Sequence, residues 1–123
     1  MRAEFKVNMK MTKATYIRRD MRKFKNEPPL RQCLVLAHQV KKTIEMQPGR
    51  TLKEISGWIG YTPARMSQIM SLLFLCPFIQ EDILLLDKPY LHKLTINQAS
   101  LIARELLWDT QREMWVKVLQ AIK

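Results

Sequence analysis

The feature that most constrains the fold is residues 51–70, TLKEISGWIGYTPARMSQIM, where two short helical patterns are separated by a glycine. The first pattern ends at Gly60, because glycine adopts the left-handed turn conformation without steric strain. Thr62 then supplies a capping hydroxyl, and Pro63 fits a first helical turn whose amide has no partner. The stretch predicts a helix over 52–59, a tight turn, and a second helix beginning at Pro63.

The first of these helices also carries its own start signal. Thr51 can cap the amide three residues later, and Glu54 can reach back to the threonine amide, which together would form a capping box. Packing positions then follow the pattern of a helix-turn-helix, in which a small residue stands four positions before the turn glycine. Ser56 occupies that position. The expected apolar positions, one and five before the glycine and six and nine after it, hold Ile59, Ile55, Met66 and Ile69.

The second helix therefore has a predicted inward face and a predicted outward face, within a helix-turn-helix over about residues 51–73. The inward face consists of Met66, Ile69, Met70 and Leu73, and the outward face of Ala64, Arg65, Ser67, Gln68 and Ser71. Arginine can bind a guanine edge through two hydrogen bonds, glutamine an adenine edge, and serine or threonine a phosphate or a base. Small residues such as Ala64 and Ser67 would let the helix lie deep in a groove. These side chains predict a helix that binds DNA.

The remaining body of the chain also has helical periodicity. After Asn26 and Pro28-Pro29, an apolar stripe runs to Gln47-Pro48-Gly49 and consists of Leu30, Cys33, Leu34, Ala37, Val40 and Ile44. Pro77 predicts a further helix start, and Thr95-Ile96-Asn97-Gln98 predicts a capping box at another. Asp109 or Thr110 begins the last predicted helix, whose apolar face is Trp115, Val118, Leu119 and Ile122. We expect residues 26–123 to form an all-α domain of about five to six helices.

Residues 1–25 differ from this body in charge. The formal net charge is +10, and nine Lys/Arg against Glu4 and Asp20 place +7 of it in residues 1–25. A basic arm ahead of a nearly balanced domain is typical of proteins that bind phosphates. We expect DNA contacts from Arg18, Arg19, Arg22 and Lys23. Apolar and polar residues alternate over Glu4 to Met11, which favours a strand paired with a second copy; residues 13–25 are either a short basic helix or an extended arm.

Composition excludes several other classes. The chain has no apolar run of the roughly 18 residues that a membrane span needs, and its first residues do not form a secretory signal, so we expect a cytoplasmic, nucleoid-associated protein. Cys33 and Cys76 are expected to be buried free thiols. His38 and His92 have no neighbouring ligand at metal-site spacing. Because the chain offers no catalytic nucleophile and no glycine-rich phosphate loop, we expect neither an enzyme nor a cofactor.

The same residues resemble a known family. TLKEISGWIGYTPARMSQIMSLLFLCPFIQEDILL and LHKLTINQASLIARELL are similar to the helix-turn-helix domain of ParB/KorB-type proteins, over roughly residues 30–107. Ala103-Arg104 stands where the family commonly has alanine-arginine. The resemblance implies an all-helical DNA-binding domain with a reading role for Thr62, Ala64, Arg65, Ser67 and Gln68. The chain lacks room for the family's nucleotide-binding domain, and RRDMR at 18–22 is not its phosphate motif, so sliding-clamp behaviour is not implied.

A narrower likeness concerns small proteins found with serine site-specific recombinases on mobile elements. The sequence ARMSQIM, the leucine-rich segment after it and WDTQREMW carry this likeness. It implies a regulator or accessory factor of a mobile element, plasmid or phage, with a recombinase as a possible partner.

The predicted site therefore combines the helix-turn-helix with the arm. Its DNA-binding residues are Thr51, Thr62, Pro63, Ala64, Arg65, Ser67, Gln68 and Ser71 in the body, with Arg18, Arg19, Arg22 and Lys23 in the arm. The expected partners are double-stranded DNA and a second copy of the chain, which would be contacted through the amino-terminal strand or the last helix around Trp115. The alternative is a protein-interaction adaptor that docks on a recombinase or polymerase without reading DNA.

Overall fold

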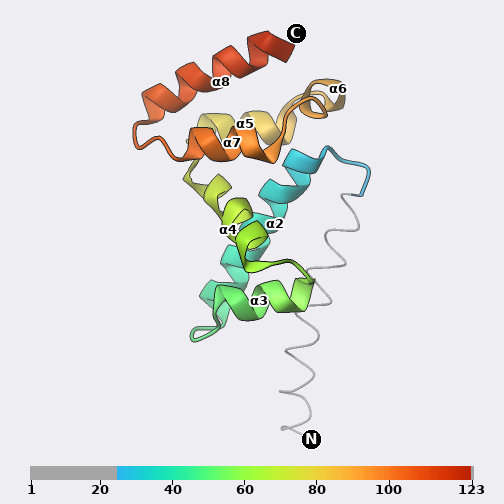
Figure 1. The fold of residues 1–123 in the computed structure, drawn as a ribbon, viewed down its shortest axis with the longest axis vertical. Helices are drawn as coiled ribbons and strands as arrows, with labels where there is room; N and C mark the ends of the chain where they lie inside the picture. The colour runs from blue at the N-terminus through green and yellow to red at the C-terminus, as the bar shows by residue number, and fades with distance from the viewer. Residues whose placement is uncertain (1–24, 123) are drawn as a thin grey trace, which may run out of the picture.

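The computed structural model describes residues 25–122, and this range is built from helices joined by short connections (Figure 1). In chain order they are α2 (Pro29–Met46), α3 (Leu52–Ile59), α4 (Pro63–Ser71), the 3-10 turn η1 (Leu72–Phe74), α5 (Pro77–Leu85), α6 (Lys88–Leu91), α7 (Ile96–Ala103) and α8 (Trp108–Ile122). No strand occurs within residues 25–122. The predicted all-α fold is confirmed. The expectations for the strand at Glu4 to Met11, and for Arg18, Arg19, Arg22 and Lys23, fall outside the described residues.

The longest helix, α2, lies at the centre of the fold. It packs against α4, η1, α5 and α7, with α3 at one end of the molecule and α8 at the other (Figure 1). The predicted stripe from Leu30 to Val40 is buried, while Ile44 is half-buried at the core edge. Leu36 is also buried, although it lies beside the predicted stripe. A helix covered on several sides buries more than one stripe, which the sequence period alone does not reveal.

Each predicted helix start lies within one residue of the start that the structure shows. α4 begins at Pro63 and α5 at Pro77, as expected. α8 begins at Trp108, one residue before the first predicted start. The short helix α6 was not among the predicted elements; its four residues are too few for an apolar period to appear.

The two predicted capping boxes have different outcomes. At α7, Thr95 Oγ1 accepts from the Gln98 amide at 3.2 Å, and the Thr95 amide donates to Gln98 Oε1 at 3.0 Å. At α3, Thr51 Oγ1 accepts from the Glu54 amide at 3.1 Å, but the Glu54 carboxylate pairs with Arg50 at 3.1 Å. The predicted return bond of Glu54 was wrong. The carboxylate has a cationic competitor four residues away, whereas Gln98 is uncharged.

Two polar side chains hold α8 against the rest of the domain. Trp115 is 1% exposed, and its indole Nε1 donates to Asp82 Oδ2 on α5 at 2.8 Å. Gln111 is equally buried and accepts from the Cys76 amide at 2.7 Å. The Trp115 side chain therefore belongs to the core of its own chain, while the expected dimer contact of the helix around it stays a prediction.

The two cysteines are free and buried, as expected. Burial raises the pKa of the Cys33 thiol, and the neighbouring Arg65 guanidinium opposes this shift more weakly. Cys33 thus behaves as an apolar core residue of α2.

Candidate functional site

The turn between α3 and α4 has the geometry that its sequence predicts. Gly60 has a φ of +92°, in the left-handed region, and its amide donates to the Ser56 carbonyl at 2.9 Å. The Tyr61 amide donates to the same carbonyl at 3.0 Å, which closes the turn. Ser56 is 1% exposed, so a larger side chain has no room there.

Apolar side chains fix the angle between α3 and α4. Ile55, Met66 and Ile69 are fully buried, and Ile59 packs against the core from a half-buried position. These are the four positions of the predicted helix-turn-helix template. The inward face of α4 is therefore as predicted, with Met70 at its half-buried edge; Leu73 is also half-buried but lies in η1, because α4 ends at Ser71.

The beginning of α4 faces solvent. Thr62 Oγ1 accepts from the Arg65 amide at 3.2 Å, while Thr62, Pro63 and Ala64 are all exposed. The threonine O–H is a donor in addition to this accepted bond. Thr51 is exposed as well and caps α3 in the same way. Both hydroxyls are placed to serve a helix cap and to donate to a phosphate oxygen.

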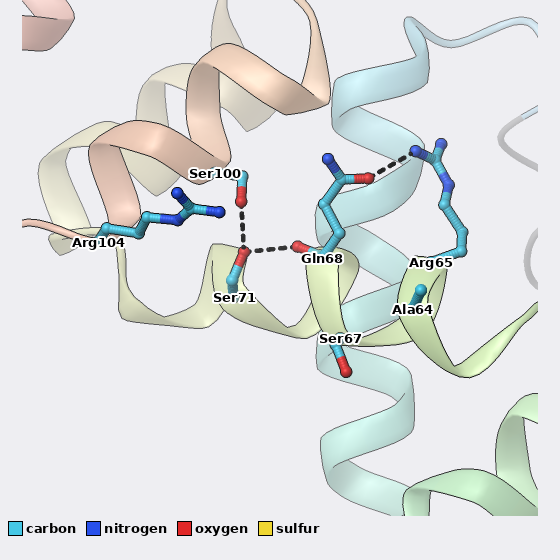
Figure 2. Close-up of a pocket in the computed structure, with 7 residues that line it drawn as sticks. All are labelled: Ala64, Arg65, Ser67, Gln68, Ser71, Ser100 and Arg104. Atoms are coloured by element: carbon cyan, nitrogen blue, oxygen red, sulfur yellow. Dashed lines mark hydrogen bonds between the residues drawn. The ribbon is translucent and has the colours of Figure 1, made fainter.

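The outward face of α4 lines an open groove of about 600 Å³ between α4 and α7 (Figure 2). Its lining residues are Ala64, Arg65, Ser67, Gln68 and Ser71 from α4, with Ser100 and Arg104 from α7 and its end. All five outward residues predicted on α4 are therefore brought to one groove. The lining contains two guanidinium groups and no carboxylate, so it favours an anionic ligand.

Arg65 and Gln68 form a connected pair on one side of this groove. Arg65 Nη1 donates to Gln68 Oε1 at 3.1 Å, as drawn in Figure 2. Arg65 Nη2 lies 3.9 Å from Cys33 Sγ on α2. Gln68 Nε2 donates in turn to Asn97 Oδ1 at the start of α7. Both polar atoms of the Gln68 amide thus have partners within the protein, whereas Arg65 retains N–H donors beyond these two contacts.

Ser71 differs from its expected role. Its hydroxyl donates to the Gln68 carbonyl at 2.6 Å and lies 3.2 Å from Ser100 Oγ on α7 (Figure 2). The side chain therefore joins α4 to α7. Ser67 and Ala64 are the exposed residues of the outward face.

Three site residues on α7 were not among the predicted DNA contacts. Asn97, Ser100 and Arg104 stand three and four positions apart, so they share one face of α7. The spacing of these polar residues could have been recognised from the sequence. Their pairing with α4 could not, because Asn97 lies 29 residues after Gln68. Arg104 is exposed and points along the groove toward Ser71 (Figure 2).

Residues 25–122 offer neither a metal site nor a single helix that could span a membrane. This range contains no group of three His, Cys, Asp or Glu side chains that could hold a metal ion. None of its helices alone has the length and apolarity to cross a membrane; Pro63–Phe74 and Pro77–Leu85 qualify only as a pair bent by 110°. Comparisons with protein-family models, curated proteins and solved structures found no match to this chain.

Proposed function

We propose that the protein binds double-stranded DNA sequence-specifically, with α4 in the major groove. The observation that carries this proposal is the α4–α7 groove, whose lining is polar and cationic and contains no carboxylate. An α-helix fits the major groove of B-DNA, and the small outward residues Ala64 and Ser67 would allow α4 to approach the bases closely. The resemblance to ParB/KorB-type domains supports the same proposal.

Within this groove we assign different roles to the two long side chains. Arg65 retains free donors and would bind a guanine edge through two hydrogen bonds. Gln68 would hold the Arg65 guanidinium in place, because its oxygen already accepts from Arg65 and its nitrogen already donates to Asn97. For Gln68 to bind adenine it would have to exchange both bonds. Arg104 and the Thr51 and Thr62 hydroxyls would contact phosphates.

The basic arm supplies the remaining part of the proposal. The nine Lys/Arg of residues 1–25 would neutralise phosphates beside the major-groove site. In the cell we propose a nucleoid-associated regulator or accessory factor of a mobile element, plasmid or phage, acting on transcription or recombination.

The test begins with selection of bound sites from a genomic fragment library, followed by binding of Arg65→Ala and Gln68→Ala to the selected site. Losing the guanine contact in Arg65→Ala should cost about 1–3 kcal/mol and abolish discrimination at one base pair. Gln68→Ala should weaken binding less and keep the preferred base. Lys117→Ala, which removes one positive charge from the exposed surface of α8, is the matched control.

Two results would overturn the proposal. One is the absence of any salt-sensitive retention of DNA, which would favour the adaptor function on a recombinase or polymerase. The other is an Arg65→Ala variant that binds the selected site and its single-base variants as the parent does.

A further inference from the structure

A second surface of the domain is apolar and is not used by the proposed DNA contacts. It lies where the α7–α8 turn meets the turn between η1 and α5, at one edge of the molecule in Figure 1. We call it the turn face and define it by its exposed side chains Phe74, Phe78, Leu106, Leu107 and Trp108. Leu106 is 94% exposed, and Phe74 and Leu107 are each 69% exposed.

Specific contacts make these residues one continuous surface. Gln111 Nε2 donates both to the Phe74 carbonyl at 3.1 Å and to the Glu105 carbonyl at 2.9 Å. One buried amide therefore holds Phe74 beside the start of the Leu106–Leu107 segment. The Arg112 guanidinium lies 5.4 Å from the Phe78 ring centroid. Arg112 is one helical turn from Trp108, which brings Phe78 and Trp108 to the same side.

The turn face has a surface area in the range of protein interfaces. From their exposed fractions and ordinary side-chain areas, the five residues leave roughly 700 Å² of mostly apolar surface in contact with water. Monomeric proteins rarely expose a functionless apolar patch larger than a few hundred Å². Two copies of such a face would bury roughly 1,400 Å² together, which is within the size range of stable, specific interfaces.

The charges around the turn face indicate which partner fits it. Three carboxylates and two guanidiniums are its neighbours in the sequence, from Glu105, Asp109 and Glu113 and from Arg112 and Arg104, the last of which also lines the α4–α7 groove. This local balance contrasts with a whole-chain net charge of +10. Because +7 of this charge lies in residues 1–25, the body is nearly balanced, and two copies that meet at this face encounter little repulsion and can pair opposite charges. Neither nucleic acid nor a strongly charged protein is favoured by such a mixed rim.

We propose that the turn face is the contact between two copies of this chain, related by a two-fold axis. Such an interface uses the same patch on both copies, so an apolar centre with charges of both signs around it is complementary to itself. The turn face contains none of the residues that line the groove on α4, and the two surfaces adjoin at Arg104. The proposal rests on the apolar surface and its charges, and not on DNA binding.

The experiment measures the mass of the full chain by light scattering over a concentration series, without DNA. We expect a species of twice the 14.6 kDa chain mass. Leu106→Glu should raise the dimer dissociation constant by at least about tenfold, because it places a carboxylate in the apolar centre of each copy. Leu85→Glu is the control, since Leu85 is 72% exposed and lies at the other end of α5.

A second variant leaves the apolar side chains in place. Glu105→Lys with Glu113→Lys changes the local net charge from −1 to +3, and the repulsion should weaken the dimer in a manner that added salt reverses. Circular dichroism establishes that each variant is folded. A parent chain that is monomeric throughout the series, or a dimer that both variants leave unchanged, would overturn the proposal.

Discussion

Gln68 on α4 donates its side-chain amide to Asn97 Oδ1 at the start of α7. Because Gln68 also accepts from Arg65 at 3.1 Å, the three side chains form a chain of hydrogen bonds along the groove. The outward face of α4 is therefore held in one arrangement before any ligand binds. Pre-ordered side chains lose less conformational freedom on binding, which favours affinity at a matching site.

Asn97→Ala tests whether this chain of bonds supports Arg65. The variant should fold normally, because Asn97 is exposed. Its affinity for the selected DNA site should fall about 2- to 12-fold, equal to the net value of one hydrogen bond, about 0.5–1.5 kcal/mol. The preferred base should not change, because Asn97 acts through Gln68. Fluorescence anisotropy on the site and its single-base variants measures both quantities, with exposed Asn26→Ala as control. An altered base preference would instead mean that Asn97 itself contacts DNA.

Local patterns predicted the turn and its neighbouring helices accurately. A glycine with positive φ, a capping threonine and an early proline each act within a few residues, so their effects can be read directly from the chain. The apolar template around Gly60 extends over only 15 residues and was likewise predictable. The five outward residues of α4 followed from the same period.

The features of the fold and the site that were not predicted depend on contacts between segments that are distant in the sequence. Asn97 lies 29 residues from Gln68, and no local rule indicates which polar residue of a later helix faces α4. Trp115 shows a related limit, because an aromatic residue on an amphipathic helix has the same pattern whether it packs in its own core or in a partner's. The Glu54 carboxylate had two possible partners, and the charged one prevailed.

Substitutions at two glycines of the α3 region should have opposite effects. Gly60→Ala puts a side chain at a φ of +92°, which should cost about 1–2 kcal/mol of unfolding free energy. Gly57 is an exposed position inside α3, and an added Cβ there meets no atom within 4 Å. Gly57→Ala should stabilise by about 0.5–1 kcal/mol, because alanine favours helix. Urea denaturation measures both, and equal effects of the same sign would contradict the turn conformation.

Gln111→Leu should be among the most destabilising polar substitutions in the domain. The side chain satisfies the buried Cys76 amide and the part-buried Phe74 and Glu105 carbonyls; leucine would leave the amide without a partner and remove a donor from both carbonyls. We expect a loss of about 2–4 kcal/mol, since each unsatisfied group costs about 1–3 kcal/mol. Gln120→Leu, an exposed position on the same helix, should change the unfolding free energy by less than about 0.5 kcal/mol. Comparable losses in the two variants would show that Gln111 is not a structural anchor.

The Glu27 carboxylate should give the domain an acid-dependent component of stability. A hydrogen bond from Arg31 at 2.6 Å lowers the Glu27 pKa below its ordinary value, and Lys88 lowers it further. Because the folded-state pKa is the lower one, this stabilisation is present above the unfolded value and is lost as the pH falls through the folded value. Arg31 also donates to the Ile83 carbonyl at 3.0 Å, which connects α2 to α5.

Glu27→Gln should therefore be less stable than the parent near pH 7, and the difference should shrink as the pH falls through the folded-state pKa of Glu27. Urea denaturation at a series of pH values measures this difference. Glu45→Gln, at the other end of α2, serves as the control. A difference between parent and Glu27→Gln that stays unchanged down to the lowest pH at which the parent is folded would contradict the role of the ionised carboxylate.

The contribution of the arm to DNA binding can be distinguished from that of α4 by the salt dependence of binding in the full chain. Replacing Arg18, Arg19 and Arg22 by glutamine removes three positive charges from the arm. If these side chains neutralise phosphates, the slope of log affinity against log salt should shrink by about 0.9 for each lost contact, and the ranking of sites should persist. Replacing Lys88, Lys93 and Lys117 by glutamine removes the same charge from the α6–α8 end of the domain and should leave the slope nearly unchanged.

Arginines that enter the minor groove would give a different result. They respond to groove width, which is narrow in A·T-rich DNA, so their loss should also reduce the preference for A·T over G·C flanks. Binding of both triple variants to matched sites with either flank distinguishes the two modes. A slope that the arm variant leaves unchanged would exclude these three arginines from the DNA contact, and the salt dependence would then have to come from the other six basic residues of the arm or from the cationic groove on α4.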